Sequence, residues 1–292
     1  MQQTKMRFII PAILVSLFSA PSIVHAQENS LLWEISGNGL KESSYLFGTI
    51  HMIGKNDFFV RDEVDSVFSK CNQVAFEIDL DDVAQLNSMQ AWLNLPEDLT
   101  MDAIIPPDQY NKIKIFFADS MGLDIKDFNT QKPFALYQQF LYGLEKSEQE
   151  SYEIYFLMKC ISSQKTVVGL EPISDEFRVM DNISYEEQIR WVIEGIDSIN
   201  AYRSDFKELI HAYQEEDLNK LKLMLKEDPV VMGEFEDALL DQRNQKWIAE
   251  ILKLIEQMPT FIAVGAMHLP GENGLISLLK EKGFTVKPIL KN

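Results

Sequence analysis

Two stretches of the sequence, far apart in the chain, combine an apolar run with a terminal Gly-x-x-His motif. SYLFGTIH ends at His51, and TFIAVGAMH ends at His268. Apolar runs of this length are typical of buried strands, and strand ends in an open α/β sheet form the edge where ligands bind. Gly48 and Gly265 allow the backbone to turn there, or another group to approach closely. If the strands are neighbours, the two imidazoles converge in an arrangement that suits a divalent metal or acid–base chemistry.

Other roles for these histidines stay open at the level of the sequence, because histidine is often half-buried for packing alone. Both imidazoles could cap a helix or fill the core. The third histidine after residue 26, His211, lies in the predicted helical stretch FKELIHAYQEE. We interpret His211 as a surface or packing residue.

Two glutamates are expected near the ends of two further strands. Glu77 lies in VAFEID, where alternation places it on the face opposite Phe76, and Glu171 ends TVVGLE. A carboxylate inside a strand costs free energy unless it is paired or binds a cation. An exposed position at the end of the strand is the alternative for Glu77. Together with the two histidines, these carboxylates give four predicted strand ends the side chains of a catalytic cleft.

Arg243 and Asn244 occupy the first turn of a predicted helix, DQRNQKWIAEILKLIEQM, whose apolar residues recur on one face. An arginine there could bind a substrate carboxylate or stabilise an oxyanion, and we expect Asn244 to contact substrate. A surface salt bridge is the alternative for Arg243, since the chain has 45 acidic residues. The sequence contains no H-E-x-x-H, Walker A, G-x-G-x-x-G or G-x-S-x-G motif, so none of those enzyme classes is indicated.

The elements that must position these side chains form an α/β pattern with a long helical region between strands. Gly-Asn-Gly at 37–39 separates LLWEIS from SSYLFGTI and predicts an antiparallel hairpin. Further strands are predicted at 73–79, 165–170, 260–265 and 284–289, and helical segments near 61–70, 82–163, 174–258 and 273–282. We therefore expect an α/β (α+β) fold with one domain over residues 27–292 and a mostly helical insertion at about 82–163.

Composition and charge restrict the class of protein. The 292 residues are 46% hydrophobic and carry a net charge of −18, which argues against a groove for nucleic acid. Lys5 and Arg7 precede an apolar run, and a small-x-small site ends at Ala26, so residues 1–26 are predicted to be a cleaved signal peptide. We expect an exported chain, periplasmic or extracellular, without a transmembrane span after cleavage. An uncleaved N-terminal anchor is the alternative.

The chain has two cysteines, and export would permit a disulfide between them. Cys71 and Cys160 each lie just ahead of a predicted strand, so they could be neighbours in a parallel sheet. Two buried free thiols are the alternative.

Five segments, taken in order, resemble the TraB/GumN family, which includes Tiki-like metalloproteases. They are LLWEISGNGLKESSYLFGTIHM, CNQVAFEIDL, VVGLEPISDEF, LLDQRNQKWIAEI and FIAVGAMHLPGENGLISLLKEKGFTVKPI, and they span roughly residues 31–290. The resemblance implies a fold like that of the erythromycin esterase and ChaN group, with helices around a central mixed sheet. It implies a site that contains His51, Glu77, Arg243 and His268. Glu171 matches the family's Gly-Leu-Glu stretch, although Pro172 follows it where many relatives have threonine.

For Tiki-type members, the resemblance implies a metal-dependent peptidase that favours manganese or cobalt, with zinc as an alternative. We hypothesise that His51, Glu77 and His268 hold one divalent ion beside a water whose pKa the ion lowers. In this hypothesis Glu171 is the general base and Arg243 stabilises the oxyanion.

Two alternatives stay open beside this hypothesis. Histidine and glutamate could activate water without a metal, as in erythromycin-esterase-like folds. The cleft could instead sequester a peptide without cleaving it. A peptide or another small molecule is the expected partner in each case, and the sequence predicts no oligomeric state.

Overall fold

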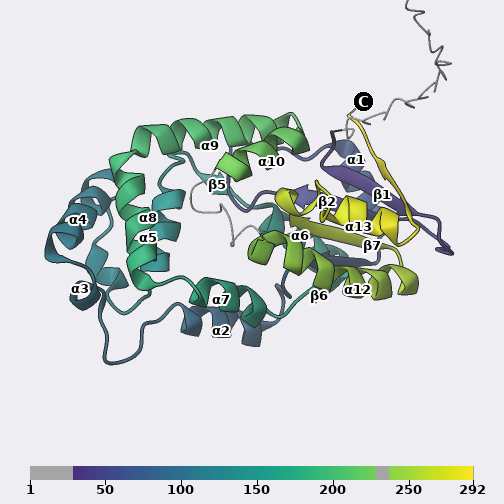
Figure 1. Cartoon of the computed structure of the whole chain (residues 1–292). Helices are drawn as coiled ribbons and strands as arrows, with labels where there is room; N and C mark the ends of the chain where they lie inside the picture. Colours follow the sequence, from purple (N-terminus) through teal and green to yellow (C-terminus); the bar gives the residue numbers. More distant parts are fainter. Residues whose placement is uncertain (1–28, 228–236, 292) are drawn as a thin grey trace, which may run out of the picture.

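Helices surround one six-stranded sheet in the computed structural model of this chain (Figure 1). The structure describes residues 29–227 and 237–291. The predicted signal peptide, residues 1–26, lies outside the described residues. Among the helices of these two ranges, none is both long enough and apolar enough to cross a lipid bilayer.

The central sheet is mixed, with the strand order β6-β4-β7-β2-β1-β8. Its strands are β1 (Leu32–Ser36), β2 (Ser44–Thr49), β4 (Gln73–Phe76), β6 (Thr166–Gly169), β7 (Thr260–Gly265) and β8 (Thr285–Pro288). The neighbours β6, β4, β7 and β2 are parallel, while β1 is antiparallel to β2 and to β8. The predicted α/β class is therefore confirmed. A second small sheet pairs β3 (Ile53–Gly54) with β5 (Gln149–Glu150).

The predicted hairpin joins β1 to β2. Gly37, Asn38 and Gly39 all have positive φ angles, of 79°, 47° and 86°, a conformation that glycine adopts freely and asparagine tolerates. Every residue of β2 is buried, as expected for an apolar strand inside a sheet covered on both faces. The strand predicted at 73–79 is shorter in the structure, because β4 ends at Phe76 and Glu77 lies just beyond it.

One hydrophobic cluster joins the sheet to the helices that cover it. These are α1 (Asp62–Lys70), α6 (Tyr152–Ser163), α9 (Ile199–Gln214) through its last turns, α10 (Leu218–Glu227), α12 (Gln242–Gln257) and α13 (Leu275–Glu281). In α12 the predicted apolar face is buried, with Trp247, Ile248 and Ile251 inside the cluster. Because this face packs on the sheet, the first turn of α12 lies over the strand ends.

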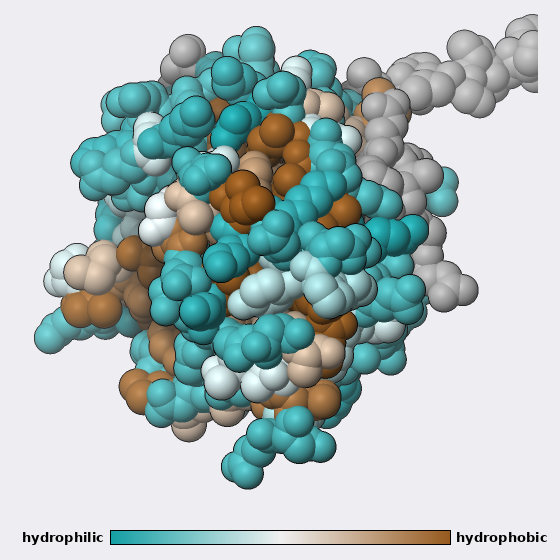
Figure 2. Space-filling model, turned by 90° about the vertical axis from the view of Figure 1, so that its left-hand side faces the viewer, coloured by the Kyte–Doolittle hydropathy of each residue, from teal (hydrophilic) through white to brown (hydrophobic). Residues whose placement is uncertain are grey.

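A second hydrophobic cluster lies at the other end of the molecule. It unites α3 (Met101–Ile104), α4 (Pro107–Met121), η1 (Ile125–Phe128), α5 (Pro133–Tyr142) and α8 (Tyr185–Asp197) with the end of α7 (Ile173–Asp181). Viewed from this end, the surface is mostly hydrophilic, with separate hydrophobic patches (Figure 2). The helix α2 (Val83–Trp92) has no buried residue and contacts α7.

The predicted helical insertion at about 82–163 overlaps this second cluster without coinciding with it. The helix α6, at the end of the predicted range, packs in the first cluster through Tyr152 and Phe156. The helix α8, outside the predicted range, contributes Trp191 and Val192 to the second. The helical layer is therefore assembled from segments on both sides of β6.

The two cysteines are free and buried, so the proposed disulfide is not formed in the structure. Cys160 lies in the last turns of α6 rather than directly ahead of β6. Burial raises the pKa of the Cys71 thiol to about 12 and that of the Cys160 thiol to about 11. Both side chains therefore act as small apolar residues of the core.

Candidate active site

The ends of the four parallel strands bring the predicted site residues to one edge of the sheet. His51 follows β2, Glu77 follows β4, Glu171 follows β6, and His268 ends the short helix η3 (Ala266–His268) after β7. The register sets this common edge, since Thr49 at the end of β2 pairs with Gly265 at the end of β7. Side chains separated by more than two hundred positions in sequence therefore share one region.

The glycines of both Gly-x-x-His motifs permit close approaches at this edge. A Cβ on Gly48 would lie 3.0 Å from the backbone of Ala266, and one on Gly265 would lie 3.2 Å from Oε1 of Glu77. The N–H of Gly265 instead donates a hydrogen bond to that oxygen at 2.8 Å. Glycine is thus needed at both positions, because the backbone of Ala266 and the carboxylate of Glu77 occupy the space that a side chain would fill.

Glu77 lies between the other charged groups of the site. Its Oε2 accepts a hydrogen bond from Nη2 of Arg243 at 2.7 Å, and its Oε1 lies 3.8 Å from Nε2 of His268. Burial would raise the pKa of Glu77, but His268, Arg243 and then His51 outweigh it and lower that pKa to about 2. Because burial lowers the pKa of His268 to about 3, that ring is neutral at pH 7. Arg243 is therefore the cation that keeps Glu77 ionised at neutral pH.

Arg243, from the first turn of α12, joins two carboxylates. Besides its bond to Glu77, it donates a hydrogen bond from Nε to Oε1 of Glu171 at 2.7 Å, and its Nη2 forms an ion pair with the same oxygen at 2.7 Å. Its guanidinium stacks over Trp247 at 4.7 Å from the ring centre. The side chain is buried, so the surface salt bridge considered for Arg243 is wrong. The residue fixes the carboxylates of β4 and β6 relative to each other.

His268 is held from its Nδ1 side. This nitrogen lies 2.7 Å from Oδ1 of Asn244, whose Nδ2 donates to the carbonyls of His268 and Asn273. Since Nδ2 is the donor, Oδ1 must accept from Nδ1–H, which leaves Nε2 unprotonated and facing Glu77. Trp247 packs on the ring with centroids 4.4 Å apart. Asn244, which we predicted to contact substrate, is buried, and its amide is engaged inside the protein, where it orients His268.

His51 is also held through Nδ1, but in an open position. The nitrogen lies 3.0 Å from Oε1 of Glu153. The partial removal of the ring from water would lower the pKa of His51. The negative charges of Glu153, and then of Glu77 and Glu176, outweigh this effect and raise the pKa to about 10. The side chain of His51 is 71% exposed, so solvent weakens the effect of these charges on its pKa. In both histidines, Nε2 is the nitrogen without a protein hydrogen bond among the described residues.

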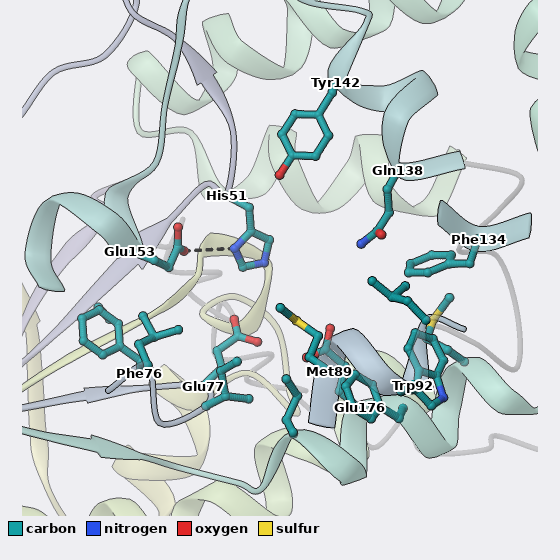
Figure 3. A pocket seen from close by; sticks show the side chains of 17 residues that line it. His51, Phe76, Glu77, Met89, Trp92, Phe134, Gln138, Tyr142, Glu153 and Glu176 are labelled. Atoms are coloured by element: carbon teal, nitrogen blue, oxygen red, sulfur yellow. Dashed lines mark hydrogen bonds and ion pairs between the residues drawn. The ribbon is translucent and has the colours of Figure 1, made fainter. Parts of the chain in front are cut away.

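A cavity of about 320 Å³ opens above Glu77. Its polar lining consists of His51, Glu77, Gln138, Glu153 and Glu176. Figure 3 shows the Glu77 carboxylate pointing toward the ring of His51, while Tyr142 and Gln138 reach in from α5. Glu77 is therefore the residue that connects the cavity to the buried network.

Glu171, predicted as the general base, does not line this cavity. Its side chain is only 3% exposed and is bound to Arg243, so it has no path to a substrate in the structure. Glu176 of α7 lines the cavity instead, and burial raises its pKa. Sequence reasoning missed Glu176 and Glu153. Glu176 lies four residues after the Pro172 cap of α7, and Glu153 lies two residues after the Ser151 cap of α6. Nothing in that pattern distinguishes them from other acidic residues in first turns.

The opposite wall of the cavity is apolar and partly aromatic. Trp92 stacks on Phe177 with centroids 4.4 Å apart and an interplanar angle of 2°, and Phe134 packs edge-on against Trp92. Nζ of Lys132, which does not line the cavity, lies 4.0 Å from the ring centre of Trp92. Met89 completes the wall from α2 (Figure 3). We call Met89, Trp92, Phe134 and Phe177 the apolar wall.

The donor atoms at this site match a divalent metal in type. Imidazole nitrogens and carboxylate oxygens bind several first-row ions. Glu77 and His268 face each other at 3.8 Å, and each histidine has the anchored Nδ1 that metal-binding histidines usually show. Across residues 29–227 and 237–291, however, no three His, Cys, Asp or Glu side chains are grouped around one point. Of the predicted set, Glu77 and His268 are thus adjacent donors, and His51 lines the same cavity as Glu77.

Comparison with known proteins identifies relatives over most of the chain. The profile of the TraB/PrgY/gumN family matches residues 31–288. The Metalloprotease TIKI1 of Xenopus tropicalis is 23% identical over 89% of this chain and 62% of its own length. The Metalloprotease TIKI homolog of Amphimedon queenslandica is 23% identical over 90% of this chain and 62% of its own length. The Metalloprotease TIKI1 of Homo sapiens is 20% identical over 89% of this chain and 62% of its own length. The chain thus spans less than two thirds of these relatives, and no solved structure matches it significantly.

The buried bridge from Arg243 predicts a large loss of stability on its removal. Arg243→Met leaves Glu77 and Glu171 buried without their counter-ion, which should lower the free energy of unfolding by about 3–5 kcal/mol. Lys253→Met is the matched control, because Lys253 pairs with Glu250 on an exposed face and its loss should change stability little. Urea unfolding followed by circular dichroism measures both. Equal, small effects of the two substitutions would contradict the role given to Arg243.

Proposed function

We propose that this chain, which belongs to the TraB/PrgY/gumN family, hydrolyses peptide bonds in the cavity lined by His51, Glu77 and Glu176. The observation that carries the proposal is the convergence of one imidazole and three carboxylates, those of Glu77, Glu153 and Glu176, on a cavity with an apolar wall. Titratable groups with displaced pKa values gather in this way at catalytic sites. The curated relatives are named metalloproteases, which supports peptide hydrolysis as the reaction class.

The side chains of the cavity divide the acid–base work. Hydrolysis of an amide needs a group that takes a proton from water and a donor for the developing oxyanion or the leaving amine. Burial raises the pKa of Glu176, so its carboxylate is a better proton acceptor than an ordinary glutamate, and we assign it the role of general base in place of Glu171. In the metal-free form of the site, Nε2–H of His51 faces the cavity and serves as the donor. With a metal bound, the same nitrogen would be a ligand and would carry no proton. Glu77, held ionised by Arg243, supplies a fixed negative charge.

We also propose a divalent metal as cofactor, on the strength of the relatives' names and of the donor types. His51, Glu77 and His268 would hold it through two Nε2 atoms and a carboxylate oxygen. When bound, such an ion polarises the carbonyl and lowers the pKa of a water. The family resemblance favours manganese or cobalt, with zinc as the alternative.

The apolar wall points to the substrate side chain that the site accepts. Trp92, Phe134 and Phe177 are fixed against one another, so their exposed faces form a preformed surface beside the polar groups. An apolar side chain next to the scissile bond would bury this surface, while the carboxylates of the cavity disfavour an acidic one. We therefore propose peptides with an aromatic or aliphatic residue at this position as substrates.

Export of the chain is part of the proposal and rests on the sequence of residues 1–26. A peptidase with this site would then meet its substrates in the periplasm or outside the cell.

Substitutions in the cavity should abolish peptide turnover. We expect His51→Ala and Glu176→Gln each to lower kcat/KM at least about 100-fold, because the first removes a proposed metal ligand or proton donor and the second a proton acceptor. Hydrolysis of a mixed peptide library, followed by mass spectrometry with added Mn²⁺, measures this. His211→Ala and Glu186→Gln are matched controls at exposed positions and should retain activity.

Treatment of the wild-type protein with a chelator should abolish turnover, and Mn²⁺ or Co²⁺ should restore it. Turnover that resists chelation would contradict the metal cofactor and favour direct activation of water by histidine and glutamate. Peptides that stay intact but bound after long incubation would contradict hydrolysis altogether and indicate sequestration.

The apolar wall predicts a selective effect of Trp92→Ala. This substitution should raise KM about 10-fold for peptides with phenylalanine or leucine beside the scissile bond and leave alanine-containing peptides unchanged. Trp92→Phe, which keeps an aromatic ring against Phe177, is the control and should retain most of the preference. A uniform change across all peptides would show that Trp92 does not select the side chain.

A further inference from the structure

We infer that Glu153 is a positioning residue for His51, holding Nδ1 of the ring so that Nε2 faces the cavity. This inference deepens the proposed function and rests on it for its catalytic consequence. That the Glu153 carboxylate orients the His51 imidazole is inferred from the contacts of Glu153 alone.

The Glu153 carboxylate is itself fixed through both oxygens. Oε1 accepts a hydrogen bond from Oγ1 of Thr49 at 2.6 Å and lies 3.0 Å from Nδ1 of His51. Oε2 accepts from Oγ of Ser151 at 2.7 Å. Three contacts from two elements leave the carboxylate one orientation, and a carboxylate can accept all of them because it has four lone-pair sites.

The elements that carry these groups are rigid. Thr49 is the last residue of β2 and is buried, and Ser151 caps the helix α6 by accepting the N–H of Ile154 at 3.4 Å. The following residue, Tyr152, anchors the start of α6 in the core, where it packs on Phe47 of β2. The distance between β2 and α6 is therefore set by packing, and the carboxylate keeps its place beside the loop that carries His51.

His51 needs such an anchor because nothing else described in the structure fixes it. Its ring is largely exposed, and its only hydrogen bond within the described residues goes to Glu153. His268 differs, since it is buried between Trp247 and Asn244. In both Gly-x-x-His motifs, Nδ1 of the histidine is bound and Nε2 is left free of a protein hydrogen bond among the described residues, but the residue that binds Nδ1 differs. A carboxylate orients the exposed ring, and an amide orients the buried one.

A purely structural role for Glu153, tying α6 to β2, is the competing explanation. In that case, the hydrogen bonds from Thr49 and Ser151 to Glu153 would connect β2 to α6, and His51 would not matter. The two explanations differ in what happens to the Nδ1–H of His51 when the carboxylate is removed from a protein that still folds.

The test is NMR of histidine ring N–H protons in the full chain, labelled with ¹⁵N-histidine. We expect two exchange-protected Nδ1–H resonances, from His51 and His268, and the absence of one in His51→Ala assigns them. Glu153→Ala should remove the His51 resonance and leave that of His268, which serves as the internal control. Glu153→Gln keeps an acceptor oxygen and should retain a weaker resonance, and it stands in if the alanine variant fails to fold.

Peptide turnover supplies the second readout. We expect Glu153→Ala to lower kcat about 10- to 100-fold with KM unchanged, and Glu153→Gln to recover part of that loss. Glu186→Gln, which changes an exposed glutamate outside the cavity, is the control and should leave kcat and KM unchanged. A His51 resonance that persists in Glu153→Ala, or is missing in the wild type, would overturn the inference. If the wild type cleaves no peptide, the proposed function fails, while the NMR result still decides the role of Glu153.

Discussion

The hydrogen bonds from Arg243 to Glu77 and Glu171 constrain the rest of the site. Two carboxylates at the ends of neighbouring strands are too costly to bury as ions unless a cation lies between them. The guanidinium meets both because its donors lie in one plane. Its position follows from the packing of α12, whose apolar face holds Trp247 in the core. The geometry of Glu77 is thus a consequence of how one amphipathic helix rests on the sheet.

Glu77 in turn connects two environments that treat their histidines differently. On the closed side, Asn244 and Trp247 hold the ring of His268 in place within the core, and burial lowers its pKa so that it is neutral. On the open side, Glu153 holds His51 at the cavity mouth, where water reaches the ring. A site of this kind can keep one imidazole as a fixed acceptor and the other as a group that exchanges protons with solvent. The repeated motif therefore produces two chemically distinct positions.

The sequence was sufficient for the features that depend on local pattern and strand order. The Gly-x-x-His repeats predicted that His51 and His268 follow strand ends. This prediction needed only the apolar run of each strand, the glycine that ends it and the histidine three positions later. The positions of Glu153 and Glu176 at the cavity could not be predicted, since they follow from how α6 and α7 pack in the fold. The burial of Glu171 and Asn244 likewise depends on α12 covering the strand ends, and a helix pattern alone does not say what it covers.

Measuring the titration of Glu77 tests the account most directly. Side-chain carboxyl ¹³C resonances, with Glu77→Gln for assignment, give the pKa of this group in the intact protein. The charges of His268, Arg243 and His51 predict a pKa of about 2, well below the value of about 4.3 that an unperturbed glutamate shows. A carboxyl that titrates at its ordinary value or above it would show that Glu77 is not held ionised between the buried network and the cavity.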